Sequence, residues 1–379
     1  MTAEEIIAFA HKNRVMIQKY QREGLFASNP VIKQTEKHVL NACYLHTLEK
    51  PSDLASLLNA FLFDVQNMIN QPVYMHHVVP KKRGGFRDIY APDKELKTAQ
   101  KHLNYYLQAY YLLIKPRNIH GFVINPHYLG RGCNIVENAK VHTGKNHLLN
   151  IDLKDFFPSI TAKRIKELFS SSWFNYDEQI TWALTLLTTY KGHLPTGAPT
   201  SPALSNFVCL ELDKELNNYA QINNLKYSRY ADDLTFSSDG RIDNDMILDI
   251  VSIINKHHFK INQKKLRLAG ANRRQTVTGI TVNQKVNVNR KLLKRTRAML
   301  HDLMKNGLYA ATSKHFLVAE DKDSALNLRF IRQLEGYINF IGQVRGRDDA
   351  VYLKLKTSYQ SLFSFPVFRT FSRHPYKVL

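Results

Sequence analysis

Residues 227–237 read Tyr-Ser-Arg-Tyr-Ala-Asp-Asp-Leu-Thr-Phe-Ser, with aromatic and β-forming residues on both sides of two adjacent acids. Such runs are typical of β-strands, and Asp is a favoured turn residue. The pattern therefore predicts a hairpin with Asp232 and Asp233 at its tip. Taken alone, this Asp pair is better interpreted as an ordinary turn than as a functional site.

A third acid ends another predicted strand. Residues 147–153 (His-Leu-Leu-Asn-Ile-Asp-Leu) are largely apolar, and Asp152 lies near their end. A carboxylate beside a buried strand loses hydration energy unless a partner compensates it. Mg²⁺ is such a partner, because it prefers oxygen ligands and is usually shared with substrate phosphates. Two such ions about 3.5–4 Å apart promote phosphoryl transfer.

Three motifs, in this chain order, carry a resemblance to reverse transcriptases. Residues 150–160 resemble the first catalytic motif of these enzymes, residues 194–202 (Leu-Pro-Thr-Gly-Ala-Pro-Thr-Ser-Pro) the motif that follows, and residues 230–233 (Tyr-Ala-Asp-Asp) their active-site box. The resemblance covers roughly residues 50–350. It implies an α+β, right-hand polymerase fold with fingers, a palm built on a small antiparallel sheet, and a helical thumb.

Two shorter elements narrow the resemblance. Residues 138–142 (Asn-Ala-Lys-Val-His) and 277–279 (Val-Thr-Gly) are similar to elements of bacterial retron reverse transcriptases, which belong to the group II intron-like superfamily. By the first resemblance, Asn138 and His142 are candidates for binding nucleic acid. For His142, a structural or RNA-facing role is favoured over a catalytic one.

By the same resemblance, Asp152 and Asp232 would be the primary ligands of two Mg²⁺ ions, and Asp233 the supporting carboxylate. Phe157 would be the aromatic side chain that excludes a ribose 2′-OH and so selects deoxynucleotides. The alternative is that Phe157 belongs to the core, although Phe156 is the better candidate for that place.

Further residues would bind the incoming dNTP. The basic turn between two predicted strands (74–79 and 86–90) resembles the fingers that hold the triphosphate, and its candidates are Lys81, Lys82 and Arg87. A Lys point charge and an Arg fork suit phosphate groups. Gly197 would let the backbone approach nucleotide and template. Thr196 stands where many viral relatives carry Gln, so the contact made by that Gln cannot be transferred.

The chain is strongly basic, with 53 Lys and Arg against 32 Asp and Glu, a net charge of +21 and 44% hydrophobic residues. This surplus favours a polyanionic partner, and the apolar content excludes wholesale disorder. From residue 290 onward, five cations crowd one predicted thumb helix, where they would contact the duplex backbone: Arg290, Lys291, Lys294, Arg295 and Arg297.

No apolar run reaches the ~18 residues of a membrane span, the first residues are not signal-like, and the three cysteines lack metal spacing. These features predict a bacterial cytoplasmic protein without disulfides. The domains are expected to be an N-terminal helical extension (1–50), fingers with part of the palm (51–146), a palm (147–284), and a thumb with the C-terminal tail (285–379).

Local patterns predict several helices. Thr2 and Glu5 have the spacing of a capping box. Apolar residues at helical spacing predict one helix through residues 54–69, capped by Ser52, and a further helix is expected over 203–216. In the tail, five aromatic side chains would pack on the thumb or meet a partner, with packing favoured: Phe363, Phe365, Phe368, Phe371 and Tyr376.

The family resemblance implies RNA-directed DNA synthesis with Mg²⁺ and dNTPs. A retron enzyme copies a structured non-coding RNA into branched msDNA, primed from a guanosine 2′-OH, and stays bound to the product. It commonly serves anti-phage defence with an effector protein, here expected to be a separate chain. Two alternatives are a group II intron-type reverse transcriptase and a protein that acts mainly as a scaffold for nucleic acid and effector.

Overall fold

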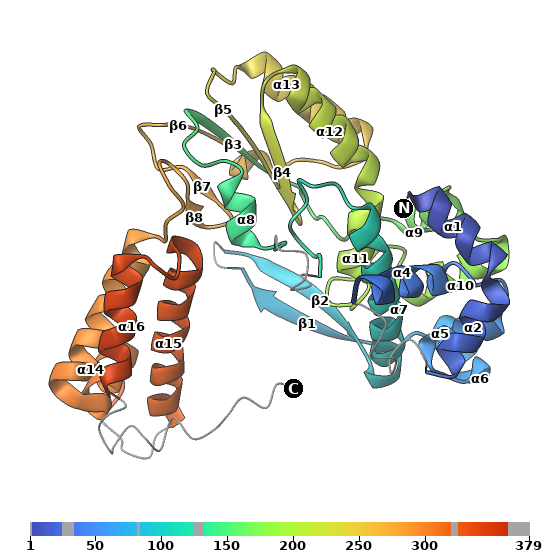
Figure 1. Ribbon diagram of the computed structural model, residues 1–379, viewed down its shortest axis with the longest axis horizontal. Helices are drawn as coiled ribbons and strands as arrows, with labels where there is room; N and C mark the ends of the chain where they lie inside the picture. Colours follow the sequence, from blue (N-terminus) through green and yellow to red (C-terminus); the bar gives the residue numbers. More distant parts are fainter. Residues whose placement is uncertain (1, 25–33, 82–83, 125–131, 320–324, 363–379) are drawn as a thin grey trace. The chain divides into compact units, whose positions relative to one another are not determined.

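The computed structural model describes residues 2–24, 34–81, 84–124, 132–319 and 325–362 (Figure 1). These residues form two compact units. The first contains the described residues of 2–141 and 147–268, and the second those of 142–146 and 269–362. The four-part division into extension, fingers, palm and thumb stays a prediction. Lys82 and the five aromatic side chains of the tail lie outside the described residues.

The first unit surrounds a core in which α7 (Lys94–Ile114) packs against α4, α5 and α11. Asp93 begins α7 by accepting a hydrogen bond from the backbone N–H of Leu96. Its apolar face, from Leu96 through Leu103 to Leu107, is buried. Its other α-helices, among the described residues, are α1 (Ala3–Lys12), α2 (Arg14–Arg22), α4 (Gln34–Leu45), α5 (Pro51–Leu58), α6 (Leu62–Asn70), α8 (Ile135–Lys140), α9 (Ala162–Ser170), α10 (Glu178–Thr188), α11 (Ser201–Val208), α12 (Leu210–Ile222) and α13 (Asn244–Lys256).

A four-stranded sheet has the order β4-β5-β3-β6, with bounds β3 (His147–Asp152), β4 (Lys226–Tyr230), β5 (Asp233–Ser238) and β6 (Arg267–Gly270). Strand β5 pairs antiparallel with both β3 and β4. Helix α12 packs along β4 and against α13 (Figure 1). The strand and hairpin predicted around Asp152 and Asp232 are thus confirmed, and the two segments become neighbours in one sheet.

A separate two-stranded sheet consists of β1 (Tyr74–Pro80) and β2 (Phe86–Pro92). The predicted basic hairpin is therefore confirmed. In β1, every residue after the half-buried Tyr74 is exposed. In β2, the residues up to Asp88 are exposed, the next three are half-buried, and Pro92 is buried. Lys81 closes the hairpin, because its N–H donates to the carbonyl of Gly85 and its own carbonyl accepts from Gly84.

Two of the predicted helices differ from the structure. The stripe over residues 54–69 is divided between α5 and α6, because Asn59 adopts a left-handed conformation (φ 54°) that ends α5. Lys50, not Ser52, precedes the first residue of α5, so the predicted cap was wrong. The predicted helix 203–216 is likewise two helices, α11 and α12. The capping box of Thr2 and Glu5 is confirmed.

The second unit begins with a tight hairpin of β7 (Thr276–Val277) and β8 (Ile280–Thr281), whose turn consists of Thr278 and Gly279 in left-handed conformations. Three helices follow and pack on one another: α14 (Arg290–Phe316), α15 (Ala325–Arg345) and α16 (Ala350–Leu362). Gly342 on α15 allows this packing, since a Cβ there would lie 2.4 Å from the ring of Tyr352.

Helix α14 is interrupted at Gly307, whose φ of 77° and ψ of 176° are not helical. Asp302, before this break, accepts hydrogen bonds from Lys314 (3.0 Å) and His315 (2.8 Å) after it. Residues twelve apart on one straight helix would lie about 18 Å apart, so the chain reverses direction at Gly307.

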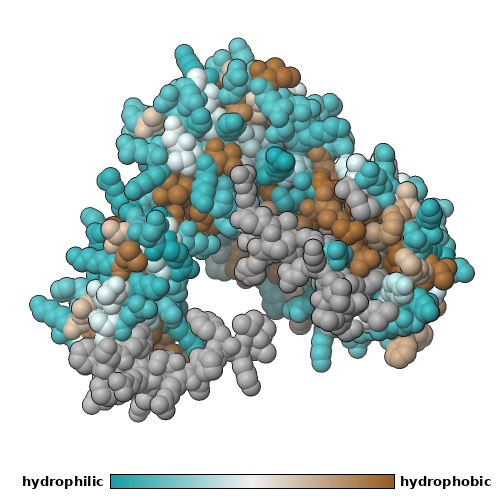
Figure 2. All heavy atoms as spheres, in the orientation of Figure 1, coloured by the Kyte–Doolittle hydropathy of each residue, from teal (hydrophilic) through white to brown (hydrophobic). Residues whose placement is uncertain are grey.

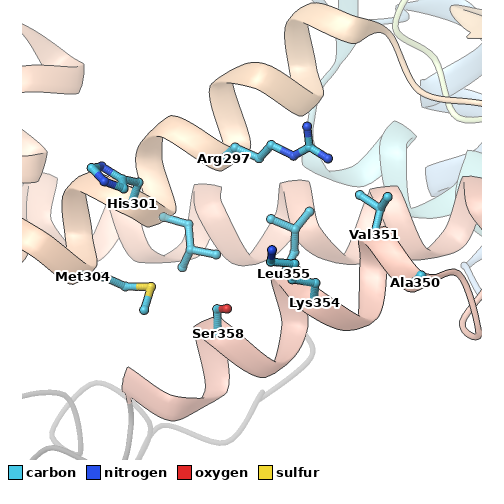
Figure 3. Close-up of a pocket in the computed structure, with 9 residues that line it drawn as sticks. Arg297, His301, Met304, Ala350, Val351, Lys354, Leu355 and Ser358 are labelled. Atoms are coloured by element: carbon cyan, nitrogen blue, oxygen red, sulfur yellow. The ribbon is translucent and has the colours of Figure 1, made fainter.

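A groove of about 510 Å³ lies between α14 and α16 (Figure 3). Its floor is apolar, with Leu300, Met304 and Leu355, and Arg297 and Lys354 are among the cationic residues that line it. Within the described part of the chain, no helix combines the length and apolar character needed to cross a membrane.

Candidate functional site

The sheet brings the three predicted acids together. Asp152, the last residue of β3, is the register partner of Asp233, the first residue of β5. Just beyond this pair, the backbone N–H of Leu153 donates to the carbonyl of Asp232 at 2.9 Å. The carbonyl of Asp152 accepts from the N–H of Asn262 at 2.8 Å. Backbone hydrogen bonds therefore hold the acidic residues of both strands at the same end of the sheet.

The carboxylates influence one another electrically. Asp152 is only 9% exposed. Burial, together with the charge on Asp152, raises the pKa of Asp232 above its ordinary value. Burial of the carboxyl and the charges of Asp232 and Asp152 raise the pKa of Asp233 to about 7, although part of that residue reaches solvent. The cluster thus carries more negative charge than its surroundings favour.

Lys265 partly offsets that charge. Its Nζ donates to Oδ2 of Asp152 at 2.7 Å, from the short 3₁₀ helix Gln263–Lys265 that follows α13. The charges of Lys265 and Arg87 both act to lower the pKa of Asp232. Lys265 is a site residue that the sequence analysis missed, and no local pattern distinguishes it from the neighbouring Lys264.

The donor set fits a divalent cation. In the described residues, no three His, Cys, Asp or Glu side chains are already grouped closely enough to enclose a metal ion. Mg²⁺, however, is usually bound by one or two carboxylates together with substrate phosphates rather than by a closed protein cage. Carboxylates whose pKa values are raised by burial and by one another's charge, as those of Asp232 and Asp233 are, suit such an ion. Asp152 and Asp232 are the residues that would hold it, with Asp233 beside them.

The turn that carries these acids is strained. Ala231 has a φ of 59°, in the left-handed region that costs an Ala about 1–2 kcal/mol. Gly121 lies directly against this turn: a Cβ on Gly121 would be 2.4 Å from the backbone N of Ala231 and 2.9 Å from the carbonyl carbon of Tyr230. Only a glycine fits there, and this contact between distant parts of the chain was also missed.

The two aromatic side chains that follow Asp152 differ in burial. Phe156 is buried and stacks on Phe259, as expected of a core residue. Phe157 is half-buried and stacks on Phe122, with ring centroids 5.8 Å apart. Asp155 is exposed and lies in the turn with a φ of 47°. The role of Phe157 in excluding ribonucleotides stays a prediction.

Gly197 makes a close backbone contact within the protein, and its predicted approach to nucleotide and template stays a prediction. It has a φ of 119°, and a Cβ would lie 3.0 Å from the carbonyl oxygen of Tyr90. Next to it, the carbonyl of Thr196 accepts from the N–H of Tyr90 at 2.7 Å. The loop of the middle motif is thus joined to strand β2, two residues beyond Asp88 and three beyond Arg87.

On the β1–β2 hairpin, Lys81 and Arg87 are exposed. Arg87 faces Val79 across the hairpin and lies near enough to Asp232 to influence its pKa. An exposed guanidinium whose field reaches the acids is well placed for a triphosphate, and this role stays a prediction.

Asn138 and His142 are buried, with 1% and 0% of their surfaces exposed. The side-chain oxygen of Asn138 accepts a hydrogen bond from the hydroxyl of Ser228 on β4 at 2.7 Å. Buried side chains cannot touch nucleic acid in this conformation, so their predicted direct binding is corrected to a place inside the protein. For His142, this agrees with the structural alternative.

All five cations predicted on the thumb helix are exposed at the start of α14: Arg290, Lys291, Lys294, Arg295 and Arg297. Hydrophilic side chains dominate the surface of the three-helix bundle on the face shown in Figure 2. Arg295 also approaches the ring of Tyr337, with 5.8 Å between guanidinium carbon and ring centroid. Contact with nucleic acid stays a prediction for these residues.

Comparison with protein families identifies the class. The sequence model of a family described as reverse transcriptase (RNA-dependent DNA polymerase) matches residues 79–282, more than half of the chain. This range contains Asp152 at the end of β3 and the β4–β5 hairpin with Asp232 and Asp233. The chain therefore belongs to the reverse transcriptase family, and the match, together with the mixture of helices and small antiparallel sheets, confirms the right-hand polymerase class.

Individual relatives narrow this assignment to the bacterial retron enzymes. Retron Ec86 reverse transcriptase of Escherichia coli is 38% identical over 229 residues, covering 59% of this chain and 67% of the relative. Retron Mx65 reverse transcriptase of Myxococcus xanthus is 35% identical over 245 residues, covering 60% and 55%. Retron Ec73 reverse transcriptase of Escherichia coli is 30% identical over 299 residues, covering 74% and 85%. The predicted retron resemblance is confirmed.

Among solved structures, one that aligns with this chain is a telomerase from Candida albicans in complex with a fragment of telomeric RNA. The alignment covers 82% of this chain and 68% of the telomerase chain. The sequence identity is 10% and the TM-score 0.43, which is too low to add to the assignment.

Proposed function

We propose that this chain is the RNA-directed DNA polymerase of a retron. It copies a structured non-coding RNA into DNA, begins from the 2′-OH of a guanosine in that RNA, and so makes the branched molecule msDNA. The observation that carries the proposal is the pairing of Asp152 with Asp233 across β3 and β5, within a chain whose relatives are retron reverse transcriptases.

The chemistry needs little beyond positioning and charge neutralisation. Two Mg²⁺ ions held by Asp152 and Asp232 would activate the attacking hydroxyl and stabilise the negative charge of the leaving pyrophosphate. Asp233 supports the cluster from the facing strand. Arg87 binds the triphosphate, with Lys81 or Lys82 beside it, and Phe157 excludes a ribose 2′-OH.

The nucleic acid partners follow from the charge and the relatives. The net charge of +21 favours folded RNA and its DNA copy, and the exposed cations from Arg290 to Arg297 contact the duplex backbone without reading its sequence. We further propose that the protein acts in the bacterial cytoplasm, remains on its msDNA and serves anti-phage defence with a separately encoded effector.

The test is Asp232→Asn, expressed with the cognate RNA gene in cells, with msDNA measured on denaturing gels. We expect msDNA to disappear while the protein accumulates normally. Asp155→Asn is the matched control, because Asp155 is an exposed acid of the same loop region at a φ that Asn tolerates. It should leave msDNA unchanged. Persistence of msDNA in Asp232→Asn would refute the catalytic assignment.

The same cells separate catalysis from scaffolding. If synthesis is the function, phage protection disappears together with msDNA. Loss of msDNA with full protection would instead favour a protein that acts mainly as a scaffold for RNA and effector.

A further inference from the structure

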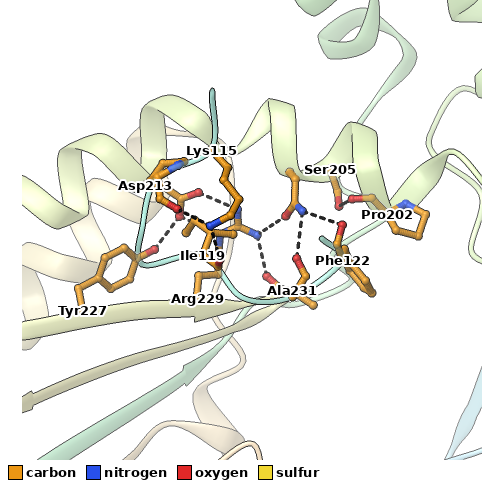
Figure 4. A network of polar contacts seen from close by, with 12 residues as sticks. Lys115, Ile119, Phe122, Pro202, Ser205, Asp213, Tyr227, Arg229 and Ala231 are labelled. Carbon is orange, nitrogen blue, oxygen red and sulfur yellow. Dashed lines mark hydrogen bonds and ion pairs between the residues drawn. The ribbon is translucent and has the colours of Figure 1, made fainter. Parts of the chain in front are cut away.

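A buried ion pair lies immediately behind the catalytic turn. Arg229 on β4 and Asp213 on α12 are both fully buried, and their two hydrogen bonds measure 2.8 and 2.6 Å (Figure 4). Burial alone would lower the pKa of Arg229, but the carboxylate of Asp213 outweighs it and holds that pKa well above the ordinary value. The guanidinium is therefore a fixed positive charge. The hydroxyl of Tyr227 also donates to Asp213, at 2.8 Å.

One arm of Arg229 reaches the catalytic turn itself. Its Nη1 donates to the carbonyl of Ala231 at 3.1 Å and to the side-chain oxygen of Asn206 at 3.0 Å. Ala231 is the left-handed residue directly before Asp232. A charged donor on its carbonyl opposes relaxation of that conformation, and Figure 4 shows the guanidinium between Asp213 and Ala231.

Asn206 extends the network to the other side of the site. Its Nδ2 donates to the carbonyls of Gly121 (3.0 Å) and Phe122 (3.3 Å). Phe122 is also left-handed, with a φ of 58°, and its ring stacks on Phe157. The same amide thus holds the backbone of the glycine that touches the catalytic turn. It also helps hold the backbone of Phe122, whose carbonyl accepts a second hydrogen bond from Gln108 at 3.0 Å.

We propose that Arg229 and Asn206 are positioning residues that set two properties of the enzyme from one buried network. Arg229 holds the turn that carries Asp232 and Asp233, and so sets the rate of nucleotide addition. Asn206 holds Phe122 against Phe157, and so sets discrimination between deoxynucleotides and ribonucleotides. This inference rests on the proposed polymerase function.

The first variant is Arg229→Lys, which keeps a positive charge for Asp213 but cannot hydrogen-bond Asp213, Asn206 and Ala231 together as the planar guanidinium does. On an RNA template with a DNA primer, we expect kcat for dNTP addition to fall about 10- to 100-fold. The KM for dNTP should stay within about threefold, since no binding group is removed.

The second variant is Asn206→Ala, which leaves the ion pair intact. It removes the hydrogen bond to Gly121 and one of the two that the carbonyl of Phe122 accepts, the other coming from Gln108 at 3.0 Å. We expect the ratio of kcat/KM for dNTP to that for the matching rNTP to fall about tenfold, because Phe122, held by one donor fewer, supports Phe157 less firmly. A merely structural residue would lower the amount of folded enzyme without changing this ratio. If Arg229→Lys does not fold, Asn206→Ala still tests the network.

Tyr227→Phe is the matched control. It removes a hydrogen bond from the same buried carboxylate but touches neither Ala231 nor Phe122. We expect a lower Tm with unchanged kcat and unchanged discrimination per folded molecule.

The inference is overturned if Arg229→Lys and Asn206→Ala match Tyr227→Phe in both kinetic properties once rates are divided by the folded fraction. Failure of the proposed function is a different result, since the wild-type protein would then add no dNTP to any RNA-templated primer.

Discussion

Gly121 offers a sharp test of how closely the catalytic turn must be positioned. In Gly121→Ala, the new Cβ would lie 2.4 Å from the backbone N of Ala231, about 1 Å closer than the 3.4 Å at which ordinary contact begins. The obstructing atom is backbone, so no side chain can rotate away. The strain must be relieved by moving either the 118–122 segment or the turn with Asp232.

A misplacement of about 1 Å at reacting groups costs roughly 100-fold in rate. We therefore expect kcat of Gly121→Ala for primer extension to fall about 100-fold, with KM for dNTP less affected. The assay is steady-state extension of a DNA primer on RNA, with Tm measured in parallel to establish the folded fraction.

The control for Gly121→Ala is Gly336→Ala on α15, where a Cβ would meet nothing within 4 Å. In a helix interior, this change should be neutral or stabilise by up to about 1 kcal/mol. The reasoning is refuted if folded Gly121→Ala extends primers within threefold of the wild-type rate.

Three further predictions concern other parts of the first unit. Phe157→Ala should reduce discrimination against rNTPs about 10- to 100-fold, measured by competing dNTP and rNTP incorporation. The control Phe156→Leu should leave discrimination unchanged, and equal effects of the two variants would contradict the role of Phe157 as a sugar gate. Arg87→Ala should raise KM for dNTP about tenfold with a smaller effect on kcat, measured by single-nucleotide addition, and an unchanged KM would exclude the triphosphate contact. Burial lowers the pKa of His46 to about 3, so the buried neutral form stabilises the fold fully above pH 6.5, and this stability is lost as the pH falls toward 3, by about 1.4 kcal/mol per pH unit. In denaturant unfolding, His46→Phe should therefore lose less stability than wild type between pH 6 and 4, and equal losses in the two proteins would contradict this.

The sequence could predict the elements that carry the acids because their signals are local. Alternation and turn residues indicate the hairpins around Asp232 and between β1 and β2, and an apolar run ending in an acid indicates β3. Local signals were weaker for helices. The apolar stripe over 54–69 continues across Asn59, but the left-handed conformation of that residue divides it into α5 and α6.

The contacts that position the acids could not be predicted in this way, because they join distant residues. Lys265 pairs with Asp152 across more than a hundred positions, and Gly121 fits against Ala231 only in the folded chain. Arg229 did carry a signal. A charged side chain inside an otherwise strand-like run requires a buried counter-charge if it faces the core, and that partner proved to be Asp213. The pattern gives no means of choosing this acid among the others.

The basic residues predicted to form binding surfaces are exposed at the start of α14 and, for Lys81 and Arg87, on the β1–β2 hairpin. The motif at 138–142, by contrast, resembles a retron element in sequence while its Asn and His are buried. Resemblance identified the family, but only burial could show that these two side chains face the protein.

The most direct test of the central claim compares Asp152→Asn with Asp155→Asn in purified protein, by the rate of single-dNTP addition to an RNA-templated primer at saturating Mg²⁺. The two substitutions remove one carboxylate each, three residues apart, at the end of β3 and in the turn that follows. We predict that Asp152→Asn loses at least about 1,000-fold in rate, while Asp155→Asn stays within about twofold of wild type. Comparable activity in the two variants would contradict the assignment of Asp152 to the catalytic centre.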